Sequence, residues 1–240
     1  MIRIPFLHAG KLEAFPPLHT ALREPNGLIA AAGDLSPERL LLAYRSGIFP
    51  WFSRGEPILW WSPDPRLVFD TGAMHIPKRL RRELKHCEFH LRADTAFTQV
   101  MRACAKPRPG QDGTWITKTM LDAYTRLHQL GHAHSVEVYA GEDLVGGIYG
   151  VAIGRMFFGE SMFSRADNAS KVALLGLAQL LKSWEWPLID AQVASAHLYT
   201  LGGFEMPRDE FAVRVAQYVA LPGRPSLWLG AADGLRPCDF

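Results

Sequence analysis

The sequence predicts a mixed α/β fold in which a small N-terminal domain precedes a larger domain built on a mixed sheet. After residue 66 the apolar patterns follow the order helices, strand meander, helix, strand, helix, strand. The first third is instead rich in Pro and Gly. Of the 240 residues, 48% are hydrophobic and 21% are charged, so the chain can bury a substantial core without disulfides or metal.

The bulk composition excludes several classes of protein. A net charge of +2 is too small for a general polycation, and the three scattered cysteines show neither a zinc spacing nor a disulfide framework. The N-terminal residues lack the apolar stretch of a signal peptide, and the apolar run at 172–181 is too short to span a bilayer. We therefore expect a cytoplasmic protein, and the absence of a coiled-coil pattern favours a monomer.

A short helix is predicted within "GDLSPERLLLAYRSG", residues 33–47. Ser36 stands at the N-cap position, Pro37 at the first helical position, and Gly47 ends the helix. Leu40 and Tyr44 belong to its apolar stripe.

The next segment, "GIFPWFSRGEPILWWSPDPR" (47–66), holds three of the seven tryptophans. Prolines at positions 50, 57, 63 and 65 exclude a continuous helix and argue against a central strand. Trp60 and Trp61 are expected to pack between two domains. We place the domain boundary here, which gives a small domain at 1–66 and a larger one at 67–240.

Regular patterns resume after this boundary. Helices are predicted at 96–105 and 117–131, followed by an antiparallel meander at 133–164 with turns at "AGED" and "AIGR". The remaining predicted elements are a helix at 168–184, a strand at 187–193, a short helix in "SAHLYTLGG" and a strand in "FEMP".

Polar side chains interrupt the strand "LIDAQV" where apolar ones are expected. Strand alternation puts Leu188, Asp190 and Gln192 on one face and Ile189 on the other, with Asp190 and Gln192 about 7 Å apart. A single buried Asp is explained by a structural hydrogen bond or a sheet edge. Two polar groups at the end of a strand, just before a helix, favour an active site.

Glu160 lies in the apolar stretch "RMFFGESMF". A carboxylate in such surroundings either pairs with a cation of the protein or binds one from a ligand. The neighbouring Ser161 does not fit a nucleophile elbow, because the second glycine of that motif is missing. His132 and His134 have an i, i+2 spacing but no third metal ligand at a recognisable distance, so we interpret them as structural.

A basic run occupies residues 78–85. Five cations accompany one acid, Glu83: Lys78, Arg79, Arg81, Arg82 and Lys85. Such a run is typical of a solvated surface helix, and the alternative is a phosphate-binding patch.

Several long motifs together resemble one known family. They include "ALREPNGLIAAAGDLSPERLLLAYRSGIFPWF", "PILWWSPDPR", "LGHAHSVEV", "LVGGIYGVAIG" and "FFGESMFSRADNASKVAL", in the order found in bacterial leucyl/phenylalanyl-tRNA–protein transferases. The resemblance covers 15–210 of the chain.

The resemblance implies a small N-terminal domain followed by a domain of the GCN5-related N-acetyltransferase fold. It implies transfer of Leu or Phe from Leu-tRNA or Phe-tRNA to the α-amine of proteins that begin with Arg or Lys, which creates a degradation signal. It also implies no metal, no ATP and no other cofactor, since the aminoacyl ester is already activated.

Site residues follow from the same resemblance. We interpret Gln192 as the group that positions the acceptor amine and Asp190 as the source of negative charge. Glu160 and Asp190 are the candidates that bind the acceptor's cationic side chain, and the basic run becomes a tRNA-binding surface. The expected donor pocket is lined by Trp51, Trp115, Phe157, Met162 and Ile189, with Ile148 and Leu177 where the resemblance predicts Met and Phe.

Two other functions stay open at this point. An acyl-CoA-dependent N-acetyltransferase could use the same scaffold, although the sequence has no Gly-rich pyrophosphate loop. A non-catalytic tRNA-binding protein is the second alternative, and it gives no reason for Asp190, Gln192 and Glu160.

Overall fold

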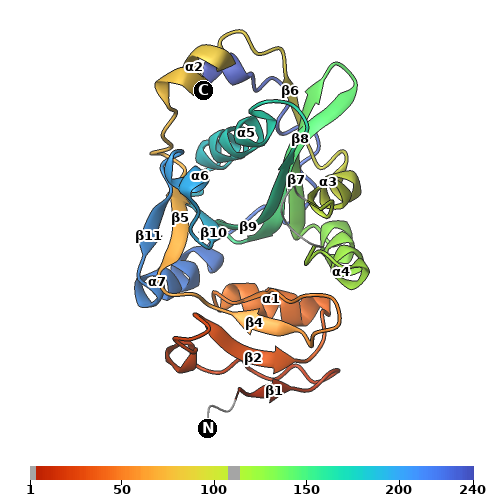
Figure 1. Ribbon diagram of the computed structural model, residues 1–240, viewed down its shortest axis with the longest axis vertical. Helices are drawn as coiled ribbons and strands as arrows, with labels where there is room; N and C mark the ends of the chain where they lie inside the picture. The colour runs from red at the N-terminus through yellow and green to blue at the C-terminus, as the bar shows by residue number, and fades with distance from the viewer. Residues whose placement is uncertain (1–3, 108–113) are drawn as a thin grey trace.

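The computed structural model describes residues 4–107 and 114–240, which form two β-sheets with helices packed around them (Figure 1). The larger, seven-stranded sheet has the order β11-β5-β10-β9-β8-β7-β6. Its strands are β5 (Arg66–Asp70), β6 (His90–Ala93), β7 (Ala133–Ala140), β8 (Asp143–Ile153), β9 (Met156–Ser164), β10 (Leu188–Gln192) and β11 (Phe204–Met206). Neighbouring strands are antiparallel except β9 and β10, so the predicted mixed sheet is confirmed.

The smaller sheet comes from the N-terminal part of the chain, in the order β1-β2-β4-β3. Its strands are β1 (Phe6–Leu7), β2 (Leu28–Ala32), β3 (Phe49–Pro50) and β4 (Leu59–Trp61). The argument from prolines against a central strand was wrong here. A strand of only three residues fits between Pro57 and Pro63, and Pro50 lies on the edge strand β3.

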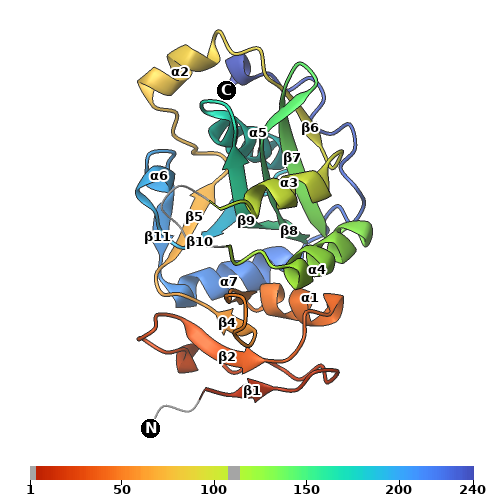
Figure 2. The same ribbon diagram turned by 45° about the vertical axis from the view of Figure 1, so that its right-hand side comes forward.

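The helices pack on both faces of the large sheet (Figures 1 and 2). The helix α5 (Ala169–Ser183) covers one face, and α3 (Phe97–Cys104) and α4 (Lys118–Gln129) cover the other. The remaining helical elements are α1 (Pro37–Arg45), α2 (Lys78–Leu84), α6 (Ala196–Tyr199), α7 (Arg208–Val219) and the 3-10 turns η1 (Leu18–Thr20) and η2 (Pro237–Asp239). None of the helices in the described ranges is long and apolar enough to cross a bilayer.

Two hydrophobic clusters make up the core, one on each face of the large sheet. The cluster beneath α5 includes Leu177 and Ile189. The other joins Trp60 of the small sheet to Tyr44 of α1 and Phe158 of β9 without interruption. The division into domains at 1–66 and 67–240 stays a prediction, because this second cluster draws on residues from both sides of it.

Close packing of α5 against β8 depends on a glycine. A Cβ atom at Gly146 would lie 2.6 Å from the Cβ of Ala169 and 2.8 Å from its carbonyl carbon. A side chain at this position would therefore push the first turn of α5 away from the sheet, and α5 forms one wall of the site described below.

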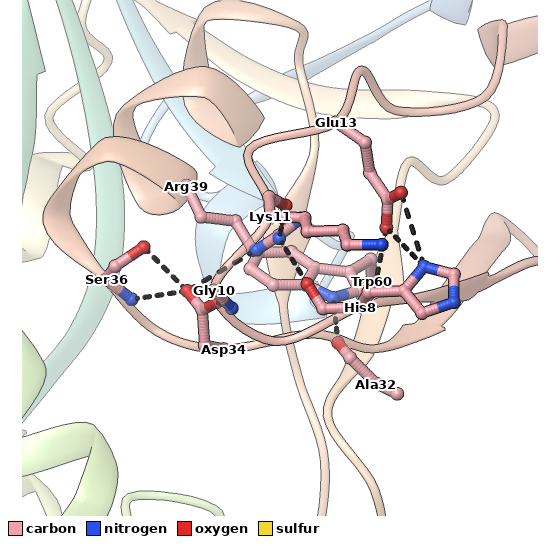
Figure 3. Close-up of polar contacts among 9 residues, drawn as sticks. All are labelled: His8, Gly10, Lys11, Glu13, Ala32, Asp34, Ser36, Arg39 and Trp60. Atoms are coloured by element: carbon pink, nitrogen blue, oxygen red, sulfur yellow. Dashed lines mark hydrogen bonds and ion pairs between the residues drawn. The ribbon is translucent and has the colours of Figure 1, made fainter.

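Arg39 fixes the N-terminal segment onto α1 (Figure 3). It is 1% exposed, donates to the backbone oxygens of His8 and Lys11, and lies 3.4 Å from Asp34. Burial raises the pKa of Asp34, but hydrogen bonds from Ser36 and Gly10 and the charge of Arg39 outweigh it and lower this pKa to about 2. Ser36 precedes α1 as predicted, but its side chain donates to Asp34 and does not cap the helix.

Candidate active site

A cavity of about 970 Å³ opens where β9 and β10 separate. Its wall contains residues from the clusters on both faces of the sheet, so the cavity passes between the two strands. Eight residues predicted from the sequence line it: Trp51, Trp115, Ile148, Glu160, Met162, Ile189, Asp190 and Gln192.

Two β-bulges explain why the strands separate. The paired register of β9 and β10 ends at Phe158 and Asp190. Directly after this pair, Glu160 is the extra residue between two successive pairs of β9 with β8, and a second irregularity in β10 falls between Asp190 and Gln192. Gln192 has a φ of 62°, in the left-handed region. Bulges bend strands and redirect side chains, and here they turn Glu160 and Gln192 toward one another.

Glu160 is the carboxyl group at the centre of the cavity wall. Its Oε1 accepts hydrogen bonds from the hydroxyl of Tyr44 and from Nε2 of Gln192, each at 2.7 Å. The Tyr44 hydroxyl also forms a hydrogen bond with the hydroxyl of Tyr124. Because Tyr44 donates its single hydroxyl proton to Glu160, Tyr124 is the donor in this second bond. The Oε2 atom is buried and has no partner in the described part of the chain. Burial raises the pKa of Glu160 from 4.5 to about 7, although the hydrogen bonds from Tyr44 and Gln192 oppose this shift.

Asp190 is fully buried and already paired with Arg66. The guanidinium makes two parallel bonds, from Nε to Oδ1 at 2.8 Å and from one terminal nitrogen to Oδ2 at 2.7 Å. It lies between the rings of Phe49 and Phe211, 4.7 Å from each centroid. The predicted role of Asp190 as a binder of the acceptor's cation is wrong, because Arg66 occupies both of its oxygens.

Asp190 instead holds the bulge that presents Gln192. Its Oδ1 accepts a hydrogen bond of 2.9 Å from the backbone N–H of Gln192, whereas the side chain of Gln192 bonds to Glu160. Asp190 and Gln192 are therefore linked through the backbone of Gln192. Asp190 thus holds this bulge in place, and Gln192 and Glu160 are two of the polar side chains that line the cavity.

Two predicted pocket residues lie outside the cavity. Phe157 is 1% exposed and packs its ring beside Trp228, at 5.9 Å between centroids. Leu177 is fully buried in the core under α5, and Leu174, one turn earlier, lines the cavity in its place. Leu174 and Leu177 are three residues apart, so they share a face of α5 but lie at different heights along the helix.

Sequence reasoning missed three residues that complete the site. The sequence marks Arg66 only as the end of the Pro/Trp segment and Tyr44 only as part of an apolar helix stripe, and it gives no role to Tyr124. An unexplained buried carboxylate predicts a cationic partner somewhere in the chain, but no local signal identified Arg66, which is 124 positions away from Asp190.

The basic run forms α2, and its five cations are all exposed. Arg79 makes an exposed ion pair with Glu83 at 2.8 Å. The run lines a second hollow with residues 167, 168 and 171 of the α5 region, away from the cavity between β9 and β10. The tRNA-binding role of this run stays a prediction.

The two predicted structural histidines differ in burial. His134 is fully buried, bonds to Asp94 through Nδ1 at 2.8 Å and stacks on Trp228. Trp228 also donates its backbone N–H to Asp94, so this cluster fastens the C-terminal segment to the sheet.

The raised pKa of Glu160 predicts a pH-dependent stability. Because the native state holds this proton more tightly than the unfolded chain, unfolding free energy should fall as pH rises from 4.5 to about 7. The variant Glu160→Gln has no such proton, so the wild type should lose stability relative to it across this window. Urea unfolding of both proteins at each pH measures the difference, and parallel curves would contradict the assigned protonation.

Comparisons with known proteins agree on one family. The family model described as "Leucyl/phenylalanyl-tRNA protein transferase" matches residues 68–216, and the model of its N-terminal domain matches residues 33–64. Three relatives carry the name leucyl/phenylalanyl-tRNA–protein transferase. One from Xanthomonas campestris pv. campestris (strain B100) is 62% identical over 89% of this chain and 86% of the relative. Another from Xanthomonas axonopodis pv. citri is 57% identical over 98% and 95%, and one from Nitrosomonas europaea is 58% identical over 89% and 91%. The chain belongs to the leucyl/phenylalanyl-tRNA–protein transferase family.

Proposed function

We propose that this chain transfers Leu or Phe from aminoacyl-tRNA to the α-amine of proteins with N-terminal Arg or Lys, and that the product is a degradation signal. The observation that carries the proposal is a single cavity with two chemically different walls. One wall is apolar and includes Ile148, Leu174 and Ile189, which suits a Leu or Phe side chain. The other carries Glu160, a carboxyl group suited to a cationic side chain.

The reaction needs positioning more than a strong base. The acceptor α-amine has an ordinary pKa near 8, so part of it is neutral at pH 7. Its nitrogen attacks the ester carbonyl, the C–O bond to the ribose breaks, an amide C–N bond forms, and one amine proton passes to the released ribose hydroxyl. In this proposal Gln192, held by the bulge and by Glu160, orients the amine for attack.

The proposal includes a relation of the larger sheet to the GCN5-related N-acetyltransferase fold. The mixed sheet has one parallel pair, β9 and β10, and the cavity lies where that pair separates. We keep this fold for residues 67–240 as part of the proposal, together with the absence of any cofactor.

The direct test is incubation of the protein with Phe-tRNA and a short peptide that begins with Arg. Mass spectrometry should show the addition of one Phe residue at the peptide's N-terminus. A peptide with a blocked α-amine is the control and should stay unchanged. Acetylation of the peptide with acetyl-CoA, in place of Phe transfer, would support the N-acetyltransferase alternative, and tight tRNA binding without any product would support the non-catalytic one.

Charge reversal on α2 tests the proposed tRNA-binding surface. The double variant Arg79→Glu, Arg82→Glu should weaken tRNA binding and reduce the salt dependence of the binding constant by roughly one unit of slope per lost contact. Transfer from an aminoacyl-adenosine, which has no phosphates, should continue. Equal losses with both donors would mean that α2 supports the fold, which circular dichroism of the variant would also detect.

Trp51→Ala tests the apolar end of the cavity mouth. Trp51 is 46% exposed and contacts Trp61 at 5.8 Å between ring centroids, so its removal costs little core packing. We expect a reduction in kcat/KM for Phe transfer on the order of 10-fold and a melting temperature close to wild type. An unchanged kcat/KM for Phe transfer would show that Trp51 does not belong to the donor pocket.

A further inference from the structure

Two cationic side chains line the mouth of the cavity and have no part in the chemistry described so far. Arg54 lies in the loop between β3 and β4, and Lys106 follows the end of α3. Both are exposed. Within residues 4–107 and 114–240, neither side chain has a hydrogen bond or an ion pair. Their charges are therefore available to a ligand.

Charge is distributed unevenly over this cavity. Its lining contains two carboxylates, Glu160 and Asp190, and Asp190 is neutralised by Arg66. The one remaining carboxyl group lies beside Gln192, where β9 and β10 separate. Glu56, the acid nearest to Arg54 in sequence, does not line the cavity, and its carboxylate accepts a hydrogen bond from the backbone of Ser53. An anion that enters with an apolar group would therefore meet Arg54 and Lys106.

Aromatic rings accompany these cations. Trp51 is three residues from Arg54 and 46% exposed, and the partly buried Trp115 lines the same cavity as Lys106. Exposed aromatic rings next to Arg and Lys are typical of binding sites for single-stranded nucleic acid, since bases stack on the rings while phosphates pair with the cations.

The mouth is separate from α2. The loop between β3 and β4 belongs to the small sheet, whereas α2 lies at the opposite end of the molecule, beside the C-terminus (Figure 1). Of the cations of the basic run, Arg79 lines a separate hollow together with Asn168 and Lys171. A donor RNA could contact α2 through its double-stranded part, but its reactive end must pass the cavity mouth.

We infer that Arg54 and Lys106 bind the phosphodiester groups of the last nucleotides of the donor RNA, and so hold its esterified end in the cavity. This inference rests on the proposed function. It adds a phosphate-binding site to the cavity mouth that is distinct from the basic surface of α2.

The test compares two donors that differ in phosphates. In the double variant Arg54→Glu, Lys106→Glu, kcat/KM for Phe-tRNA should fall by roughly 100-fold at low salt, about 10-fold for each lost phosphate contact, and its salt dependence should become shallower. The value for phenylalanyl-adenosine, which has no phosphate, should change by less than about 2-fold. Arg126→Glu is the matched control, because Arg126 is an exposed cation on α4 outside the cavity lining.

Binding of uncharged tRNA, measured by fluorescence anisotropy, gives a readout that does not need the reaction. The double variant should bind uncharged tRNA more weakly than both the wild type and Arg126→Glu. Unchanged affinity for uncharged tRNA, or an equal loss of transfer from both donors, would overturn the inference. If the wild type transfers Phe from neither donor while the variant still loses tRNA affinity, the proposed function fails and the phosphate site stands.

Discussion

Replacement of Asp190 by Ala should reduce the free energy of unfolding by about 3–5 kcal/mol and abolish most transfer activity. The stability loss follows from the buried pair, because Arg66 would keep a fully buried charge without its carboxylate. One terminal nitrogen of Arg66 already has no partner in the described chain, so no other group is in place to compensate. Urea unfolding and a Phe-transfer assay measure the two effects.

A second variant separates activity from stability. In Arg66→Met, Asp190→Leu both charges are replaced by apolar side chains of similar size, which is often neutral or stabilising for a buried pair. The backbone N–H of Gln192 still loses its acceptor, so the bulge that presents Gln192 loosens. We expect a folded protein with strongly reduced kcat. Wild-type turnover in this variant would show that Asp190 serves folding alone.

Replacement of Glu160 by Gln should raise KM for an Arg-initiated peptide by at least about 30-fold, with a smaller effect on kcat. Loss of one member of a desolvated charge pair costs about 2–5 kcal/mol, and 2 kcal/mol corresponds to about 30-fold. The amide oxygen of the new side chain still accepts hydrogen bonds from Tyr44 and Gln192, so the local geometry is retained. Steady-state kinetics with varied peptide concentration separate KM from kcat.

Glu137 offers a matched control for this substitution. It is fully buried, burial raises its pKa to about 7, and its partners are Ser135 and Thr95, none of which lines the cavity. Glu137→Gln should change stability without changing KM for the peptide. A similar rise of KM in both variants, or an unchanged KM in Glu160→Gln, would show that Glu160 does not bind the cationic side chain of the acceptor.

Periodicity predicted the fold well wherever an element is long and its pattern is unmixed. The meander at 133–164 became β7, β8 and β9, and the helix at 168–184 became α5, because apolar spacing alone determines which face is buried. The helix α7 was not predicted, since its apolar contacts are few, with Phe211 and Val215 as its buried residues. The small sheet was missed because its strands of two to five residues lie in a segment rich in Pro and Gly, where no alternation stands out.

The site shows the same limit in another form. Glu160, Asp190 and Gln192 could be identified because a polar residue within an apolar strand is visible in the linear sequence. Tyr44 and Arg66 were not, since their importance depends on contacts across more than 100 positions of sequence. Alternation also failed at the two bulges, where one extra residue shifts the phase of every side chain that follows.

Because each bulge contains one extra residue, the site depends on the number of residues in β9 and β10 as well as on their side chains. Before Glu160, Phe158 faces the core beneath α1; after it, Phe163 takes that face and Met162 turns to the other. Deletion of one residue between 159 and 161 would leave these two faces unchanged, but it would bring β9 back into regular pairing with β8 and remove the bulge that presents Glu160. Insertions and deletions in these two short stretches should therefore impair the site more than a substitution at one cavity residue, because the space between β9 and β10 depends on one extra residue in each strand.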